Sequence, residues 1–415
     1  MNLFIYHPQG NTNVKESAIG FAEANLLKEF HTSIACFPKS ILDSLGNIPY
    51  VAEVRRRKFD ILLKPFTRTS PILEVGRLIS QKAGFTRFMQ RETALFSAEA
   101  VTRHLDKKVA ASLRNASTNA GVYAYEDGAY FSFHEAKRRG IKCFYDLPTG
   151  YWRAKMKILE EEKKQFPGWQ DTMPGLTNSK EKLWRKDEEL KMADRIFVAS
   201  NFTKSTLNEY PGKLPPIQVI PYGFPEVSRP KNYFKTNRNA PVKLLFVGSL
   251  SQQKGIANLF QAANALGEKV SLTLIGQKST TNCLALNTEL LKHRWIPSLS
   301  HNKVLEEMRN HDILVFPTLF DGFGLVISEA MSQGTPVIAT DNCAGPDLIE
   351  NGKNGWIVNA GSTAMLQSTI LKLTEEPELI AKAGVEAMLT ASKRPWHIYR
   401  RELSNAIKSY YEALQ

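Results

Sequence analysis

The sequence predicts an α/β protein built from two doubly wound parallel sheets that face each other across a cleft. Three observations support this fold class. Short apolar segments alternate with amphipathic segments in both halves of the chain, as they do where helices cover both faces of a parallel sheet. Each half opens with an apolar segment, a glycine-containing loop and a helical stretch. Of the 415 residues, 43% are hydrophobic and 23% are charged, which excludes a disordered chain.

The first half contains four apolar segments that we expect to be strands. They are residues 3–6, 121–125, 143–145 and 196–199. The loop Gly10-Asn11 follows the first of them, and a helix is expected from about residue 15 to residue 30.

The second half repeats this arrangement. Its expected strands are residues 244–247, 271–275, 313–316 and 337–340, and the first of them leads through a glycine-bounded loop into an expected helix over 256–266. The last segment has apolar residues at 396, 399, 403, 406, 407, 410 and 414, a helical stripe. A helix of that length spans roughly 28 Å, enough to cross back to the first half.

These elements divide the chain into two expected domains. The first covers residues 1–224 and takes in the final helix, 396–415, and the second covers 242–395. The segment 225–241 (PEVSRPKNYFKTNRNAP) has no helical or strand period and is expected to be a linker. A ligand would bind in the cleft between the domains.

Composition also indicates where the protein works. The four cysteines lie far apart without CxxC spacing, which excludes a zinc ribbon and favours a reducing compartment. No apolar run approaches the roughly 18 residues that span a bilayer, and no signal-peptide core follows the N-terminus. We therefore expect a cytoplasmic protein.

The net charge of +13 is concentrated in one stretch. Residues 55–91 contain ten lysines and arginines against Asp60 and Glu74, interleaved with isoleucine, leucine and phenylalanine. Apolar anchors among cations suit an anionic lipid surface, at the inner face of a membrane, or an anionic lipid-linked substrate. The alternative is a solvated basic face beside core residues. Nucleic acid is not an expected partner, because no motif of a common binding module is present.

The segment FDGFGLVISEAMSQGTPVIAT at residues 320–340 carries the clearest chemical signal. Asp321, Gly322, Phe323 and Gly324 follow an expected strand and lead into a helix that begins near Leu325. Glycines there allow close backbone approach, so that free N–H groups at the helix start can bind an anion. Glu329, about one turn into the helix, could bind ribose hydroxyls.

A second loop after a strand, from Gly248 and Ser249 to Lys254 and Gly255, supports the same site. Lys254 could place a cation on a diphosphate. A solvated lysine, a turn aspartate and a solvated helix glutamate are the alternatives for each motif alone. Together, at the carboxyl ends of strands in one domain, the two loops and the acid predict a nucleotide-diphosphate site.

With these motifs the chain resembles the retaining glycosyltransferases of family 4, also called group 1 glycosyltransferases. Their signature pairs a Gly-x-Leu-x-x-x-Lys-Gly loop, here 248–255, with two acids eight positions apart around Gly-Phe-Gly, here Asp321 and Glu329. The likeness is strongest over residues 244–357, with PVIAT at 336–340 and NGKNG at 351–355, and weaker at DRIFVAS (194–200) and PYG (221–223).

The resemblance implies the GT-B fold, in which two Rossmann-like domains face each other and the C-terminal one binds a nucleotide-sugar. It also implies transfer of a sugar to an acceptor hydroxyl with retention, often in cell-surface polysaccharide or lipopolysaccharide assembly. No metal or other cofactor is required, because Lys254 and the helix N-terminus would stabilise the leaving diphosphate. The candidate catalytic residues are Asp321, Glu329, Lys254 and Asp127, and the candidate donor-binding residues are Gly10, Asn11, Gly248, Ser249, Lys254, Gly322, Phe323, Gly324, Leu325 and Glu329.

Two departures from the family pattern stand out. Ser249 occupies the position where the family commonly has an arginine, so that one phosphate cation is missing, and Lys278 is a candidate substitute. Asp321 replaces the usual glutamate and is one methylene shorter.

The N-terminal half of such enzymes binds the acceptor, a glycan or a lipid-linked glycan, and its site is less clear in this sequence. Many members have a histidine at a strand end where this chain has Glu126-Asp127, and Asp146 ends the next strand. Each of these acids could instead cap a helix or a turn. Trp152-Arg153 and Trp169 could line an acceptor pocket or pack into the core.

Other functions remain open from the sequence. A nucleotide-sugar epimerase or a sugar phosphorylase would use a related cleft, and a non-catalytic protein could bind the same nucleotide-sugar.

Overall fold

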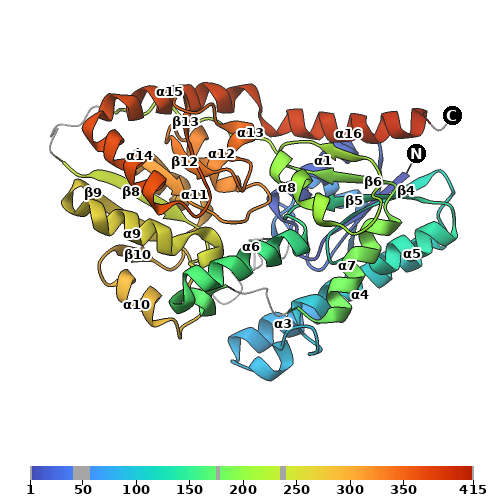
Figure 1. Ribbon diagram of the computed structural model, residues 1–415. Helices are drawn as coiled ribbons and strands as arrows, with labels where there is room; N and C mark the ends of the chain where they lie inside the picture. The colour runs from blue at the N-terminus through green and yellow to red at the C-terminus, as the bar shows by residue number, and fades with distance from the viewer. Residues whose placement is uncertain (1, 41–56, 174–177, 234–239, 414–415) are drawn as a thin grey trace.

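Two parallel sheets covered by helices make up the computed structural model of the protein (Figure 1). The structure describes residues 2–40, 57–173, 178–233 and 240–413 of the 415. Within these residues the strands form one seven-stranded and one six-stranded sheet, and every pairing between neighbouring strands is parallel. The predicted α/β class with two doubly wound sheets is therefore confirmed.

The first sheet has the order β3-β2-β1-β4-β5-β6-β7. Its strands are β1 (Asn2–Tyr6), β2 (Leu27–Thr32), β3 (Thr67–Thr69), β4 (Ala120–Tyr125), β5 (Lys142–Leu147), β6 (Arg195–Val198) and β7 (Ile217–Val219). Every residue of β4 is buried, because helices pack on both faces of the sheet at this point. The surrounding helices are α1 (Thr12–Glu23), α3 (Ile72–Lys82), α4 (Ala98–Leu113), α5 (Tyr130–Arg138), α6 (Trp152–Gln165), α7 (Lys180–Met192) and α8 (Asn201–Thr206).

The second sheet has the order β10-β9-β8-β11-β12-β13. Its strands are β8 (Val242–Val247), β9 (Val270–Ile275), β10 (Arg294–Ile296), β11 (Ile313–Phe316), β12 (Val337–Thr340) and β13 (Gly355–Val358). The two central strands β11 and β12 are fully buried. The helices here are α9 (Ile256–Leu266), α10 (Leu284–Leu290), α11 (His301–Asn310), α12 (Leu325–Ser332), α13 (Gly345–Leu348), α14 (Thr363–Glu375) and α15 (Pro377–Lys393).

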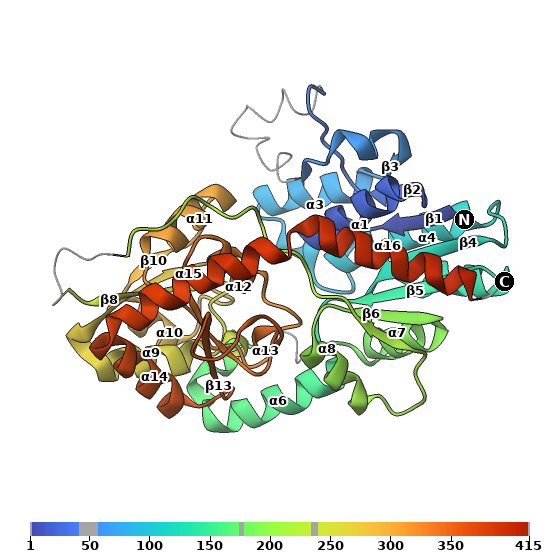
Figure 2. The same ribbon diagram turned by 90° about the horizontal axis from the view of Figure 1, so that it is seen from above.

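The last helix, α16 (Trp396–Glu412), crosses from the second sheet to the first and packs against α1 (Figure 2). Arg400 pairs with Glu16 at 2.6 Å and with Glu23 at 2.9 Å, and the Tyr399 and Ser17 hydroxyls lie 2.9 Å apart. Where α16 begins, the Phe224 N–H donates to the Arg394 carbonyl at 2.9 Å. The crossing predicted for the final helix is therefore present over 396–412, and residues 414–415 lie outside the described chain.

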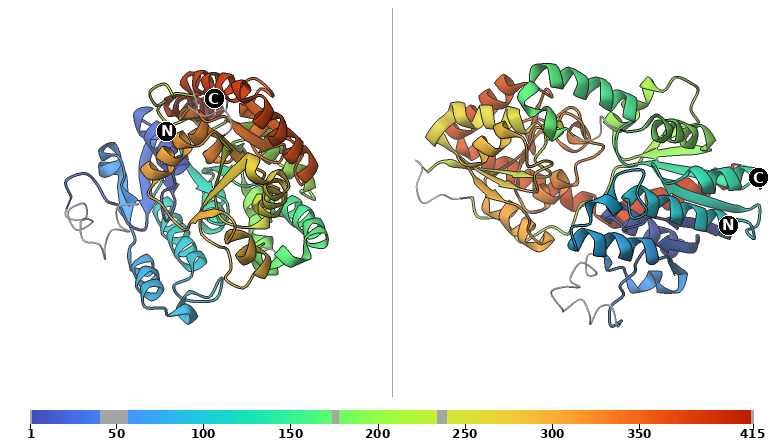
Figure 3. Two further views of the ribbon diagram at one scale, coloured as in Figure 1. Left: turned by 90° about the vertical axis from the view of Figure 1, so that its left-hand side faces the viewer. Right: turned by 90° about the horizontal axis from the view of Figure 1, so that it is seen from below.

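A second connection runs along the opposite side of the molecule. Helix α6 and the 3-10 turn η4 (Pro167–Thr172) follow β5 of the first sheet but reach the second sheet (Figure 3). The Trp169 ring stacks on Phe260 of α9 at 5.9 Å, and the Gln252 side-chain amide donates to Glu162 at 2.5 Å. The two sheets are thus held together by α16 on one side and by α6 and η4 on the other.

One predicted element was too long. The helix expected over residues 15–30 ends at Glu23, and Phe30 belongs to strand β2. Asn25 has a φ of 56°, which turns the chain out of the helix, and the Leu26 N–H bonds back to the Phe21 carbonyl at 2.8 Å. Apolar residues at 26, 27 and 30 continue the helical spacing, so that periodicity alone did not reveal the turn.

The segment expected to be a linker holds no helix or strand in its described residues, and 234–239 lie outside the described chain. Lys231 donates to Thr335 at 2.8 Å, and Tyr233 donates to the Gly334 carbonyl at 2.6 Å. The first part of the segment therefore lies against the α12–β12 turn of the second sheet.

The contact between α1 and α16 can be tested at Gly20. A Cβ on Gly20 would lie 2.9 Å from the Arg400 Cβ and 3.0 Å from its Cα. We expect Gly20→Val to lower the stability by about 1–3 kcal/mol, since overpacking forces the two helices apart. Urea unfolding followed by circular dichroism measures the change. Gly168→Ala is the matched control, because a Cβ at Gly168 meets nothing within 4 Å. Equal losses in both variants would contradict the tight contact.

Candidate functional site

A hollow of about 300 Å³ opens between the two sheets, at the carboxyl ends of β8 and β11. Seven residues predicted to bind the donor or take part in catalysis line it: Gly248, Lys254, Asp321, Phe323, Gly324, Leu325 and Glu329. The remaining lining residues are Asn13, Pro148, Tyr222, Val247, Phe316 and Val326. We call this space the donor hollow, after the donor-binding role that the sequence predicts for its residues. The structure thus brings the lysine loop and both acids together, although about 70 residues of chain separate Lys254 from Asp321.

Lys254 and Asp321 form an ion pair inside the donor hollow. Each side chain is about one-fifth exposed, and the ammonium lies 5.5 Å from the centre of the Phe316 ring. The second Asp321 oxygen accepts the Phe323 N–H at 3.2 Å, which holds the loop before α12. The lysine is therefore already positioned at the α12 N-terminus, with a carboxylate as its partner.

Close backbone contact places Lys254 there. Gly255 has a φ of +69°, and a Cβ on it would lie 1.8 Å from the Pro317 carbonyl oxygen, so that no other residue fits. The Gln253 carbonyl accepts the Leu319 N–H at 2.9 Å, and its side chain donates to the Phe320 carbonyl at 3.0 Å. The lysine loop and the segment after β11 are thereby joined along their main chains.

Helix α12 begins at Leu325 with its N-terminus at the donor hollow. Gly324, the residue before it, has a φ of 82° and no side chain that caps the first turn. Unpaired N–H groups and the helix dipole therefore face the hollow, and they favour an anion.

Glu329 lies on the same helix with its side chain 18% exposed. Burial raises the pKa of its carboxyl above the ordinary value, while His301, at 3.8 Å, lowers it in part. A carboxylate so placed can accept hydrogen bonds from ligand hydroxyls inside the hollow.

The first sheet closes the donor hollow from the other side. A Cβ on Gly322 would lie 2.0 Å from the Pro148 carbonyl oxygen, and the Gly322 carbonyl accepts hydrogen bonds from the hydroxyls of Ser200 and Thr203. Asn13 donates to the Tyr222 hydroxyl at 3.1 Å, and the Tyr222 ring lies 4.9 Å from Phe323. Gly322 therefore serves as a contact between the domains rather than as a lining residue.

A second hollow of about 160 Å³ lies at the carboxyl ends of β1 and β4. We call it the N-terminal hollow. Its lining residues are Tyr6, His7, Pro8, Gln9, Glu74, Ala98, Val101, Thr102, Tyr125, Glu126, Asp127 and Gly128. The candidate catalytic residue Asp127 is therefore placed in this space and not in the donor hollow.

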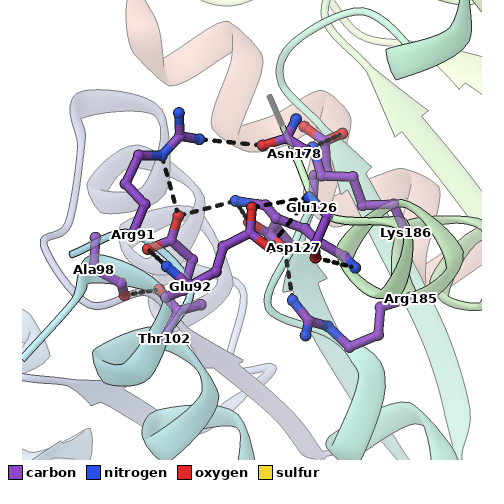
Figure 4. Close-up of polar contacts among 12 residues, drawn as sticks. Arg91, Glu92, Ala98, Thr102, Glu126, Asp127, Asn178, Arg185 and Lys186 are labelled. Carbon is purple, nitrogen blue, oxygen red and sulfur yellow. Dashed lines mark hydrogen bonds and ion pairs between the residues drawn. The ribbon is translucent and has the colours of Figure 1, made fainter. Parts of the chain in front are cut away.

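Asp127 and Glu126 are held by a network of basic residues (Figure 4). The Asp127 carboxylate lies 2.8 Å from Lys182 and 3.3 Å from Arg185, both on α7. Glu126 pairs with Lys186 at 3.0 Å and accepts the Thr149 hydroxyl at 2.7 Å. Two acids at one strand end are thus compensated by three cations from one helix.

His7 shapes the loop after β1, part of which lines the N-terminal hollow. Burial lowers the pKa of its ring to about 4, so that the ring is neutral at pH 7. Nδ1 can then accept the N–H groups of Gln9 at 3.1 Å and Gly10 at 3.0 Å. Gly10 itself is packed against Phe59, and Asn11 is exposed at the start of α1, and neither lines the donor hollow.

Two further candidates for phosphate binding, Ser249 and Lys278, do not line the donor hollow. Ser249 is exposed, and its hydroxyl lies 3.5 Å from that of Ser251. Lys278 donates to Asn287 at 2.6 Å and lies over the Trp295 ring at 4.6 Å, outside the donor hollow. In the described residues, Lys254 is thus the one lysine or arginine among those that line the donor hollow.

The remaining acceptor candidates have structural partners. Asp146 is 3% exposed and accepts the Tyr123 hydroxyl at 2.6 Å. Trp152 and Arg153 both bond to Asp187, at 2.7 and 2.6 Å. Trp169 packs on Phe260 of α9, which agrees with the core alternative.

Sequence reasoning missed Asn13, Pro148 and Tyr222 as wall residues. Tyr222 lies in the PYG segment and Asn13 two residues after the predicted loop, so that both were close to a recognised signal. Pro148 was not identifiable, because its position depends on the approach of the two sheets. Among the described residues, no three histidine, cysteine or acidic side chains converge as they would around a metal ion.

Comparison with known proteins agrees with this geometry. Residues 228–388 match the family model "Glycosyl transferases group 1". The chain is 31% identical over 152 residues to the capsular polysaccharide biosynthesis glycosyltransferase CapM of Staphylococcus aureus, and 29% identical over 154 residues to the putative glycosyltransferase EpsD of Bacillus subtilis. These alignments cover 34% and 36% of this chain and 38% and 40% of the relatives, so that the chain spans about two-fifths of their length.

Solved structures match the whole chain. Sucrose-phosphate synthase from Thermosynechococcus elongatus superimposes with a TM-score of 0.67 at 15% identity, over 100% of both chains. Anabaena HepE in complex with UDP-glucose covers 99% of this chain and 100% of its own, with a TM-score of 0.61 at 16% identity. The lipopolysaccharide outer core galactosyltransferase WaaB has the same coverage and TM-score at 17% identity. The fold is therefore that of GT-B glycosyltransferases.

The buried state of Asp146 predicts a pH effect on stability. Burial raises the pKa of its carboxyl to about 7, against 3.8 ordinarily. Between these values the folded state keeps a proton that the unfolded state has lost, so that the unfolding free energy falls as the pH rises. Asp146→Asn has no such proton, and its stability relative to the wild type should rise by about 3 kcal/mol from pH 4.5 to pH 8.

Urea unfolding at both pH values measures this difference. Asp171→Asn, at an exposed aspartate, is the control and should follow the wild type. Parallel stability curves for Asp146→Asn and the wild type would show that Asp146 is ionised in the folded protein at neutral pH.

Proposed function

We propose that the protein is a retaining glycosyltransferase, which transfers a hexosyl or related sugar from a nucleotide-diphosphate sugar to an acceptor hydroxyl. One observation carries this proposal: Lys254, the N-terminus of α12 and Glu329 line one hollow between two Rossmann-like domains. A cation and free N–H groups suit a diphosphate, and a nearby carboxylate suits a ribose. The family match over 228–388 supports the same function.

The donor would bind mainly to the second domain. Its diphosphate would lie at Gly248 and Gly324, its ribose at Glu329, and its sugar near Asp321 and the N–H group of Leu325. The fold neighbour HepE has been solved with UDP and with UDP-glucose, which makes uridine nucleotides the first donors to test.

The chemical step separates charge. As the bond between the anomeric carbon and the phosphate oxygen breaks, negative charge grows on the leaving nucleoside diphosphate. The acceptor oxygen forms the new bond on the same face, and its proton passes to a donor phosphate oxygen. Lys254 and the α12 N–H groups would stabilise the leaving group by electrostatics that exist before the reaction begins, so that no metal is required.

The Lys254–Asp321 pair suggests a sequence of events, in which the donor binds first and Asp321 is released afterwards. Without donor the ammonium is neutralised by the carboxylate. An entering diphosphate carries more charge and would draw Lys254 to itself, which frees Asp321 to orient the sugar or to stabilise positive charge at its anomeric carbon. The shorter Asp321 side chain suits both tasks, because it already reaches the lysine across the hollow.

The N-terminal hollow would take the acceptor, a glycan or a lipid-linked glycan. Asp127 is the candidate group there, held in place by Lys182 and Arg185. The similarity to CapM and the fold shared with WaaB favour cell-surface polysaccharide or lipopolysaccharide assembly, in the cytoplasm, as the setting.

Donor binding tests the assignment of the donor hollow. A thermal-shift screen of nucleoside diphosphates and their sugar conjugates identifies the donor first. We then expect Lys254→Ala and Glu329→Ala each to weaken donor binding by about tenfold or more, with a large loss of turnover, since each removes one charged contact. Calorimetry with the wild type and both variants measures the effect.

Matched controls keep this test specific. Lys269→Ala and Glu350→Ala remove a lysine and a glutamate of the second domain that pair at its surface with Glu375 and Lys353. Both should bind donor as the wild type does. Unchanged affinity in Lys254→Ala and Glu329→Ala would refute the site.

The products test the reaction itself. We expect full turnover in excess chelator and a new glycosidic bond with the anomeric configuration of the donor, measured by nucleotide release and proton NMR. A strict metal requirement or an inverted product would contradict the mechanism. An isomerised nucleotide-sugar would instead indicate an epimerase, a sugar phosphate a phosphorylase, and donor binding without turnover a non-catalytic binding protein.

A further inference from the structure

Large apolar side chains are exposed on one part of the molecule far more than elsewhere. Among the described residues, eight of the fourteen exposed large hydrophobic side chains lie between positions 61 and 95. They are Ile61, Leu62, Ile72, Val75, Ile79, Phe85, Phe88 and Leu95. Scattered exposed leucines are ordinary, but a cluster of this size calls for a partner.

Helix α3, at the centre of this cluster, exposes its apolar residues, whereas a usual surface helix buries them. Ile72, Val75 and Ile79 follow one stripe of the helix and are 80%, 41% and 60% exposed. The buried positions are instead Glu74, 1% exposed, and Ser80, 3% exposed. The apolar face therefore points to solvent and the acidic residue points inward.

A buried ion pair sets this orientation. Glu74 bonds to Arg57, itself 4% exposed, and to Arg77 at 2.7 Å. Turning the helix over to bury its isoleucines would expose this pair and leave Arg57 buried without a carboxylate, at a high cost in free energy. The exposed isoleucines are thus a stable property of the folded chain.

The chain after α3 extends the apolar surface. Phe85 and Phe88, 55% and 50% exposed, lie with their rings 6.3 Å apart in the turn that follows the helix. We define the α3 face as Ile72, Val75, Ile79, Phe85 and Phe88. In Figure 1, α3 and the turns after it project from the lower edge of the molecule, away from both sheets.

The sequence around the α3 face carries more cations than acids, although Arg68 lies 3.8 Å from Glu29 and Arg91 lies 3.7 Å from Glu99. Between residues 60 and 91, six lysines and arginines stand against two acids, and Glu74 is one of these acids. Five of the six cations are exposed: Lys64, Arg68, Lys82, Arg87 and Arg91. Arg55 and Arg56, part of the same basic stretch in the sequence, lie outside the described residues.

We propose that the α3 face docks on an anionic lipid membrane, with its isoleucines and phenylalanines in the interface and the surrounding cations on lipid headgroups. An amphipathic helix with an apolar face and flanking lysines and arginines has the chemistry for this position. None of the helices in the described part of the chain is long and apolar enough to cross a membrane.

Charge favours a membrane over a second copy of the chain. Two α3 faces in contact would bring like charges together, whereas anionic headgroups neutralise them. Glu74 and the N-terminal hollow that it lines lie on the inner side of the same helix, so that docking would hold this hollow beside the lipid headgroups. The docking itself does not depend on the chemistry proposed above.

Co-sedimentation of the full chain with lipid vesicles tests the proposal. We expect binding to phosphatidylcholine vesicles that contain phosphatidylglycerol, weaker binding at high salt, and little binding to pure phosphatidylcholine. The triple variant Ile72→Ser, Ile79→Ser, Phe85→Ser should bind about tenfold less, because it removes the apolar anchors. The charge variant Lys64→Glu, Arg87→Glu should lose the dependence on phosphatidylglycerol.

The matched control is Val385→Ser, Leu389→Ser on α15, where two apolar side chains are 49% and 48% exposed. It should bind vesicles as the wild type does, and equal melting temperatures show that all variants fold. Absence of vesicle binding by the wild type, equal binding by the triple variant, or a wild-type dimer that the triple variant converts to a monomer would overturn the proposal. Vesicle binding by a protein that fails to bind any nucleotide-sugar would overturn the proposed function and leave the docking standing.

Discussion

The rest of this structure depends on two close main-chain contacts, at Gly255 and Gly322, which leave no room for a side chain. A Cβ on Gly255 would lie 1.8 Å from the Pro317 carbonyl oxygen, and one on Gly322 would lie 2.0 Å from that of Pro148. The first contact joins two loops of the second domain and places Lys254 at Asp321. The second brings the first domain against the same loop. The donor hollow exists because both contacts are made at once. These main-chain contacts also fix where the charged side chains inside the hollow lie.

The electrostatics of the hollow follow from this geometry. In the described residues that line it, one lysine faces two carboxylates and the open end of α12. The lysine is paired with the nearer carboxylate, while burial raises the pKa of the farther one. A ligand anion that binds here therefore competes with Asp321 for Lys254. Ser249 stands where the family pattern has an arginine, and Lys278 bonds to Asn287, so that Lys254 is the one lysine or arginine among the described residues that line the hollow.

The two connections between the sheets have different consequences for movement. Helix α16 begins beside Phe224. Contacts of Arg400 with Glu16, and of Tyr399, hold this helix on the first domain. Helix α6 and η4 reach the second domain beside the lysine loop, where Glu162 bonds to Gln252 and Trp169 stacks on Phe260. If the hollow opens, this second contact must either break or move with the second domain. Gln252, which makes the hydrogen bond, lies two residues before Lys254. Domain movement and the position of the lysine are for this reason physically linked.

By itself the sequence determined the fold class, most central strands, the helix over Ile256–Leu266 and the lysine and acid motifs of one domain, because these depend on local periodicity and on glycines at strand ends. It did not determine where α1 ends, because apolar spacing continues through the turn at Asn25. Only the tertiary structure showed that Asp127 lies in a separate hollow with the cations of α7, and that Lys278 donates to Asn287. It also showed that Asn13, Pro148 and Tyr222 line the donor hollow. It also decided that α3 turns its isoleucines outward, since Arg57, which lies 17 positions before Glu74, supplies the buried partner of that glutamate. Side-chain direction and partnership are set by contacts between distant segments, and those contacts leave no local pattern in the chain.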